Sequence, residues 1–207
     1  MQITIFGASG SVGRLVVSEA LKRGYDVVAF VHNHNPFEEL NHLTIVKGDI
    51  ANSGDITKAL LGSEAVISCL GSWGQPGRNV LTTAMTAIIP AMKAQKITRI
   101  ITLTGSGAMA PDVTEGLGHK LFMKAMAPFP AGKVFHDGEQ HMKLLAVSSL
   151  DWTSLRSPIM KSKGTSAYQL TSKASNARLP RSAVVAALID QLTLTEYIYQ
   201  APIIKSA

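Results

Sequence analysis

The sequence is poor in cysteine and in charged residues, and both shortages narrow the class of protein. Its 207 residues contain one cysteine, Cys69, so an internal disulfide cannot form and a cysteine-based metal cluster is not expected. Charged residues make up 16% of the chain and hydrophobic residues 46%, a balance that is typical of a packed domain and not of a disordered chain. We therefore expect a cytoplasmic protein with no metal site.

Long hydrophobic runs are also missing. No stretch approaches the roughly 20 apolar residues of a membrane helix, and the chain starts with a strand-like pattern that leaves no room for a signal peptide. The net charge is +6, but the basic residues are scattered and never form a run of five. We expect a monomer or small homo-oligomer without membrane or nucleic-acid partners, in which a basic site suits an anionic cofactor and substrate.

Apolar strands alternate with segments of helical spacing along most of the chain. Gln2–Phe6 is a β-rich run, apolar residues then recur at helical spacing up to Leu21, and Asp26–Val31 resumes as a strand. This alternation predicts an α/β fold of the Rossmann type, with a doubly wound, mostly parallel sheet and helices on both faces. We expect further strands at Leu43–Lys47, Ala65–Leu70, Ile97–Thr104, Asp151–Arg156 and near Tyr197–Ile204, and helices at Ser53–Leu61, about Asn79–Gln95, about Asp137–Val147 and Arg181–Leu192.

Two segments lack a clear period. Met109–Phe135 holds methionines, prolines and glycines, and Lys161–Leu179 is polar. We expect one NAD(P)-binding domain, residues 1–207, with a small lobe on the substrate side around 109–136 and 158–180. Pro90 should kink or restart its helix because proline has no N–H to donate.

A glycine motif lies between the first strand and the first helix. Residues 7–13 have the spacing GxxGxxG, in which Gly7 permits a tight turn, Gly10 lets the backbone approach a pyrophosphate, and Gly13 allows close helix–strand packing. The position in the first βα unit supports a dinucleotide site. The residues expected to bind NADP or NAD here are Gly7, Ala8, Ser9, Gly10, Ser11, Val12 and Gly13.

The residue at the end of the second strand decides which adenosine ribose is accepted. An acid there would bind the 2′-hydroxyl and repel a 2′-phosphate. This sequence has His32 and Asn33, with no acid until Glu38 and with Arg14 on the first helix. The pattern favours NADP over NAD; the alternative interpretation of His32 is an exposed loop histidine without a ligand.

Three other residues lie at or just after the carboxyl ends of predicted strands. Asp49 follows the third strand and either binds the adenine edge or caps the next helix; both readings stay open. Gly71 follows the fourth strand, where a glycine lets the backbone pass close to a cofactor. Cys69 lies in an apolar run and is expected to be a packing residue rather than a nucleophile.

The chain resembles the atypical short-chain dehydrogenase/reductases of the NAD(P)H-binding group, which includes flavin reductases and biliverdin reductase B. The matching segments are GASGSVG at 7–13, GDI at 48–50, ISCLGS at 67–72, RIITLTGSGA at 99–108 and LDWTSLRSPIM at 150–160. Together they span almost the whole chain, and the last is the most specific. Besides the glycine loop and the end of strand two, the resemblance implies cofactor contacts at Asp49, Ile50, Leu70, Gly71, Ser72, Thr104 and Gly105, with Pro158 near the nicotinamide. His32 replaces the arginine common in the group.

The Tyr-x-x-x-Lys pair of ordinary short-chain dehydrogenases is missing, since Tyr168 and Lys173 are five residues apart. Alcohol–carbonyl chemistry needs a positioned acid, whereas a flavin or quinone accepts hydride readily and takes its proton from water. We therefore expect an NAD(P)H-dependent reductase of a flavin, quinone or similar planar acceptor, with flavin a possible substrate, in an apolar slot lined by Trp73 and Met109–Phe135.

Four polar residues on the substrate side are candidates for assisting catalysis: Ser106, Lys133, His136 and His141. For each of them, a surface role without chemistry fits the sequence as well. Two other functions remain open: a non-catalytic NADP(H) redox sensor of the NmrA type, and an isomerase or epimerase acting on a nucleotide-linked sugar. The fold alone does not choose among these functions.

Overall fold

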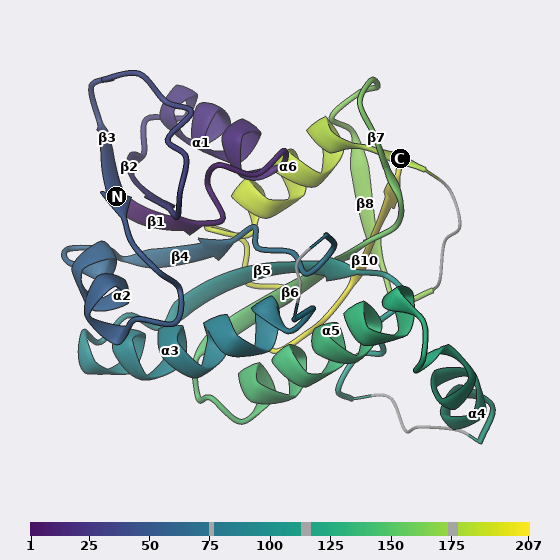
Figure 1. Ribbon diagram of the computed structural model, residues 1–207. Coiled ribbons are helices and arrows are strands. Elements are labelled where there is room, and N and C mark those ends of the chain that lie inside the picture. The colour runs from purple at the N-terminus through teal and green to yellow at the C-terminus, as the bar shows by residue number, and fades with distance from the viewer. Residues whose placement is uncertain (75–76, 113–116, 174–177) are drawn as a thin grey trace.

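The computed structural model describes residues 1–74, 77–112, 117–173 and 178–207. Its centre is an eight-stranded sheet in the order β3-β2-β1-β4-β5-β6-β10-β8 (Figure 1). The strands are β1 (Gln2–Phe6), β2 (Asp26–Val31), β3 (Leu43–Lys47), β4 (Ala65–Ser68), β5 (Arg99–Gly105), β6 (Asp151–Ser157), β8 (Tyr168–Thr171) and β10 (Ile203–Ser206), with β7 (Met160–Lys161) and β9 (Leu179–Pro180) paired separately. All neighbours in the sheet are parallel except β8, which is antiparallel to β10.

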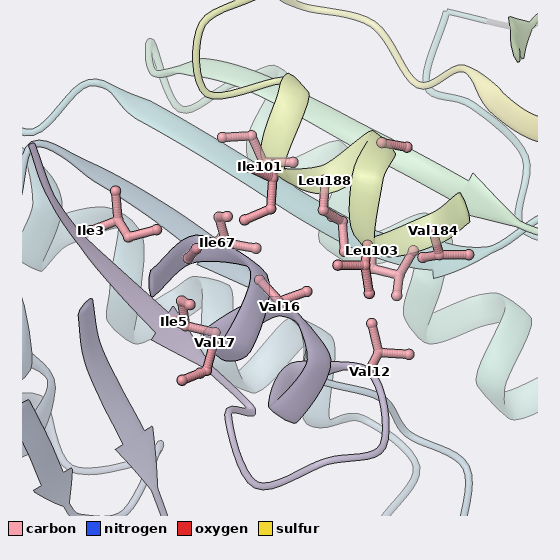
Figure 2. Close-up of a cluster of buried hydrophobic side chains, with 14 of the residues drawn as sticks. Ile3, Ile5, Val12, Val16, Val17, Ile67, Ile101, Leu103, Val184 and Leu188 are labelled. Atoms are coloured by element: carbon pink, nitrogen blue, oxygen red, sulfur yellow. The ribbon is translucent and has the colours of Figure 1, made fainter. Parts of the chain in front are cut away.

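Helices cover both faces of this sheet, as the sequence predicts. They are α1 (Gly13–Lys22), α2 (Ser53–Leu60), α3 (Val80–Ala94), α4 (Leu117–Met126), α5 (Pro130–Ala146) and α6 (Arg181–Asp190). Figure 1 shows α1 and α6 on one face and α2, α3 and α5 on the other. Figure 2 shows the first core, where Ile3 and Ile5 of β1 pack with Val16 and Val17 of α1. Because the sheet is buried on both faces, β2 and β4 are apolar at almost every position.

The order of the strands reverses at β1. The chain goes from β1 outward to β2 and β3, then returns to place β4 on the other side of β1. The loops that follow the carboxyl ends of β1 and β4 therefore diverge, and such a point is where open α/β sheets bind ligands. Phe6 and Ser68 are paired at these two ends, so the glycine loop and residues 70–72 start side by side.

Several element boundaries differ from the sequence prediction. Helix α5 begins at Pro130 and not at Asp137, and proline is well suited to the first helical position. Helix α4 lies within the segment expected to be irregular. Helix α3 continues past Pro90, which is exposed, so the predicted restart does not occur. Within the described part of the chain, no helix has the length and apolar character to cross a membrane.

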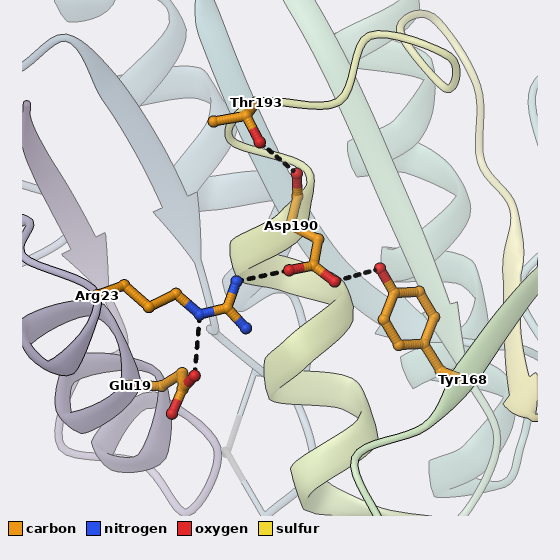
Figure 3. Close-up of polar contacts among 5 residues, drawn as sticks. All are labelled: Glu19, Arg23, Tyr168, Asp190 and Thr193. Atoms are coloured by element: carbon orange, nitrogen blue, oxygen red, sulfur yellow. Dashed lines mark hydrogen bonds and ion pairs between the residues drawn. The ribbon is translucent and has the colours of Figure 1, made fainter.

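A carboxylate ties the edge strand β8 to the two helices on its face (Figure 3). Asp190 accepts hydrogen bonds from the hydroxyl of Tyr168 (2.7 Å) and from Arg23 (2.6 Å), which also donates to Glu19 (2.9 Å). Burial, followed by the hydrogen bond to Asp190, raises the pKa of Tyr168. Tyr168 therefore holds the fold together at this point and is a poor proton donor.

Candidate functional site

The glycine loop, residues 7–13, shows why each glycine is needed. Gly7 has a φ of +72°, and a Cβ there would lie 2.9 Å from the backbone of Cys69. A Cβ on Gly13 would collide with the carbonyl oxygen of Gly7. At Gly10, which is exposed, a Cβ would meet only that same oxygen, at 3.2 Å. Gly7 and Gly13 thus serve the fold, whereas Gly10 leaves the surface of the loop open.

The start of α1 suits an anion. No side chain caps the helix, and its first turn holds no acidic residue; the N–H of Arg14 donates to the carbonyl of Gly10 (3.0 Å), but no carboxylate repels an anion there. Ala8 and Val12 are buried in the core, so only their backbone faces the loop, while Ser9 is half-buried and Ser11 is exposed. This arrangement fits the pyrophosphate of a dinucleotide.

The residues after β2 form a neutral to basic surface. His32 and Asn33 are both exposed. The Nδ1 atom of His32 lies 3.1 Å from the carbonyl oxygen of Gly48, so Nδ1 is the donor in this contact and Nε2 remains available. Arg14 is exposed in the first turn of α1. None of these side chains is acidic, so none of them would repel a 2′-phosphate. The preference for NADP over NAD stays a prediction.

Asp49 is not the cap of α2. The side chain of Asn52 accepts hydrogen bonds from the backbone of Gly54 and Asp55, at 2.9 and 3.2 Å, and so caps that helix. Asp49 instead accepts from the N–H of Ala51 (2.9 Å) and is exposed. The capping interpretation of Asp49 is therefore wrong, and an adenine contact stays a prediction. Its neighbour Ile50 is half-buried against the core.

The ends of β4 and β5 leave space beside their backbones. A Cβ on Gly71 or on Gly105 would meet nothing within 4 Å. Leu70 packs against the core below Gly71, and Pro158 is buried immediately after β6. A ligand can therefore approach the backbone closely at Gly71 and Gly105, whereas the predicted contacts of Leu70 and Pro158 stay predictions.

Thr104 and Ser106 lie at the end of β5 but differ in direction. A Cβ on Gly138 would lie 2.6 Å from the hydroxyl oxygen of Thr104, so this buried side chain points toward α5. Any contact of Thr104 with a cofactor would therefore use its backbone. Ser106 is half-buried, and its N–H donates to the carbonyl of Ser157 (2.8 Å).

Asp137 is a central residue of the site that sequence reasoning missed. The residue is 3% exposed, and its carboxylate accepts from the backbone of Leu81 (3.0 Å) and Thr82 (2.9 Å), from the hydroxyl of Thr82 (2.6 Å) and from the hydroxyl of Ser72. The α3 cap residue Asn79 makes no side-chain bond of its own. Asp137 therefore caps α3 from a neighbouring helix and fixes the loop after β4.

A cavity of about 540 Å³ lies between the start of α3, α4 and α5. Lys133, His136 and Gln140 reach it from one face of α5, because residues three and four apart share a helix face. The other lining residues are Gly77, Arg78, Asn79, Thr82, Met123, Ala127, Gly132 and Asp137. The structure thus brings two of the four candidate helpers together. Trp73 is not among the lining residues and is 61% exposed, so the slot predicted beside it is wrong in that respect.

His141 lies on the other side of α5. It is fully buried, with Nε2 3.0 Å from the hydroxyl of Thr102 and Nδ1 2.8 Å from the carbonyl of Gly138. Burial lowers the pKa of His141 to about 4. Five residues after His136 the helix has turned by about 140°, which carries His141 into the core. The expectation that it faces the substrate is wrong.

Cys69 behaves as a packing residue. It contacts the core, and burial raises the pKa of its thiol to about 12, which disfavours the reactive thiolate. Among the described residues, no group of three or more histidines, cysteines and acids is placed to hold a metal ion.

Comparison with known proteins identifies the family to which the chain belongs. A family model described as NAD(P)H-binding matches residues 7–194. The uncharacterized protein YwnB of Bacillus subtilis is 30% identical over 159 residues, 75% of this chain and 70% of that protein. A short-chain dehydrogenase/reductase from Veillonella parvula in complex with NADP (TM-score 0.78) and the anaerobilin reductase ChuY from Escherichia coli O157:H7 (TM-score 0.77) are each 19% identical. Each comparison covers 99% of this chain, and 94% and 96% of those structures, which shows a shared fold.

Proposed function

Because the chain belongs to the NAD(P)H-binding family and fits its atypical short-chain dehydrogenase/reductase group, we propose that it transfers hydride from NADPH to a planar acceptor such as a flavin or quinone. The observation that carries this proposal is the position of the 540 Å³ cavity. Ser72, in the loop after β4, is bonded to Asp137, which lines the cavity. Asp137 therefore holds both the wall of the cavity proposed for the acceptor and the loop after β4, which is proposed to contact the cofactor. The NADP-bound and reductase neighbours are consistent with this chemistry.

The cavity suits an acceptor that is anionic and has an apolar part. Its volume lies in the usual range of ligand pockets, and Met123, Ala127 and Gly132 give it an apolar part. Arg78 and Lys133 add positive charge to its wall, while the carboxylate of Asp137 is already bonded to four donors. Among flavins, FMN with its phosphate therefore suits the cavity better than uncharged riboflavin.

Hydride transfer here depends on positioning. The nicotinamide supplies the hydride when the cofactor is bound, and the protein holds donor and acceptor together and limits access of water. The pKa values of Tyr168, Tyr197 and Tyr199 are all raised, so these tyrosines are poor acids. His136 is exposed in the cavity and is the best-placed residue to help deliver a proton, alongside water.

Purified protein should oxidise NADPH with FMN as acceptor, followed anaerobically at 340 nm. His136→Ala and Lys133→Ala should each lower the rate only about tenfold, or roughly 1.4 kcal/mol of barrier, because each helps positioning without being a dedicated acid. His42→Ala is the matched control, since His42 is exposed and paired with Asp26 at the start of β3. Its rate should equal that of the unmodified protein.

Two results would contradict this mechanism. A thousandfold loss in His136→Ala, with folding and NADPH affinity intact, would identify a dedicated general acid. If NADPH binds but neither a flavin nor a quinone is reduced, the proposed reaction is wrong and a redox-sensing role becomes the better interpretation.

NADPH should bind more tightly than NADH, because His32 stands where an acid would select NADH. His32→Asp should weaken NADPH binding about tenfold, or roughly 1.4 kcal/mol, and leave NADH binding equal or tighter. Asn41→Asp adds the same charge at an exposed loop position and serves as the control. Titration of both cofactors measures the effect, and a tenfold preference of the unmodified protein for NADH would refute the assignment of His32.

A further inference from the structure

A second cavity, of about 390 Å³, lies along the edge of the sheet that β6, β10 and β8 form. It shares no lining residue with the first cavity. Its lining residues are Ala110, Asp112, Arg156, Leu170, Thr171, Ser172, Tyr197, Gln200, Ala201 and Pro202. The proposed reaction uses none of these residues.

Arg156 is the positively charged residue that lines this cavity. The residue is only 8% exposed, and it donates from Nε to the carbonyl of Ala201 (2.7 Å) and from Nη1 to the carbonyl of Ala108 (3.2 Å). A guanidinium has five N–H donors, and Nη2 has no acceptor among the described residues. Two carbonyls hold the side chain in place and leave one edge of the fork for another partner.

Arg156 forms no direct ion pair with a carboxylate among the described residues. Asp112 also lines the cavity, but it acts on Arg156 only through longer-range attraction and forms no ion pair with it. Burial lowers the pKa of Arg156, as expected where water solvates a cation poorly. An anion that reaches the free edge of the guanidinium would relieve this cost.

The other walls restrict the kind of anion. Thr171, Ser172 and Gln200 offer hydroxyl and amide groups, while Leu170 and Pro202 are apolar. The negative charge of Asp112 disfavours a doubly charged ligand such as phosphate, because the single charge of Arg156 neutralises one anionic charge. A planar carboxylate also matches two parallel N–H donors.

We propose that this cavity binds a small organic monocarboxylate with an apolar body, whose carboxylate pairs with Arg156. The site goes beyond the proposed reductase function and does not depend on it. Benzoate is a suitable probe, because it combines one carboxylate with a compact apolar ring, and benzamide is its uncharged counterpart.

Titration of ¹⁵N-labelled protein with benzoate should shift the amide signals of Ser172, Gln200 and Ala201. Benzoate should bind at least tenfold more tightly than benzamide or inorganic phosphate. Ser172 is exposed at the wall, so Ser172→Trp fills the cavity without removing either bond that Arg156 makes, and it should abolish the shifts. Ser53→Trp, on α2, which packs against β2 and β3 far from this cavity along the sheet, is the matched control and should bind benzoate normally.

Arg156→Lys tests the guanidinium itself and should weaken benzoate binding at least tenfold, because an ammonium cannot offer two parallel donors. Should that variant unfold, the result with Ser172→Trp still decides. The proposal is wrong if no shifts occur, if benzamide binds as well as benzoate, if the shifts map to Lys133 and His136, or if Ser172→Trp binds benzoate unchanged.

Discussion

Gly10→Val is expected to weaken NADPH binding at least 100-fold, or about 2.7 kcal/mol, while the protein stays folded. The Cβ of the new residue meets only the carbonyl oxygen of Gly7, at 3.2 Å, and the backbone of Gly10 is not in the left-handed region. The branched side chain would instead extend over the open surface of the loop, where the pyrophosphate has to approach the N–H groups of α1.

The test combines NADPH titration with thermal unfolding. Gly118→Val is the matched control, because Gly118 lies on α4 and a Cβ there meets nothing within 4 Å. The control should keep the NADPH affinity of the unmodified protein. Gly13→Val would be a poor test, since its Cβ would collide with the carbonyl of Gly7 and disturb the fold. Full NADPH affinity in a folded Gly10→Val protein would show that the dinucleotide does not bind on this loop.

The cofactor half of the molecule could be predicted because its information is local. The strands β1, β2 and β3 have the bounds that apolar runs alone predict; β1 and β2 are buried at almost every position, whereas in the edge strand β3 only Val46 is buried. The glycine spacing of residues 7–13 reports a backbone requirement, which the collision expected at Gly13 confirms. Most of this information is local, although Gly7 is also constrained by the backbone of Cys69 at the end of β4.

The acceptor half was harder to predict because its geometry depends on contacts between distant elements. The sequence does not show that α5 begins at Pro130, since proline and glycine in Pro130–Gly132 are also typical of loops. Without the true start of the helix, the sequence does not show which of its residues lie on the same helix face. With the helix taken from Asp137, there was no reason to separate His136, which lines the cavity, from His141, which is buried. Phase on a helix follows only from the packing of its apolar face.

Asp137 illustrates the same limit and gives the second large effect. Asp137→Ala should lower the free energy of unfolding by about 3 kcal/mol, because the start of α3 loses its cap and the donors of Ser72, Leu81 and Thr82 are left unsatisfied. For a chain of this size that corresponds to about 6–12 °C in Tm. Glu39→Ala, at an exposed position, is the control for loss of a carboxylate and should leave Tm unchanged.

The functional effect of Asp137→Ala separates its two roles. If Asp137 fixes both the loop after β4 and the wall of the acceptor cavity, KM for FMN should rise in the folded variant at low temperature. Ser72→Ala removes only the bond to that loop and should produce a smaller loss of stability, about 1 kcal/mol. In a double-mutant cycle the two changes should be coupled, because the hydroxyl and the carboxylate are direct partners. The capping role is wrong if Asp137→Ala is as stable as the unmodified protein. The pairing with Ser72 is wrong if the free-energy changes of Asp137→Ala and Ser72→Ala are strictly additive in the double variant.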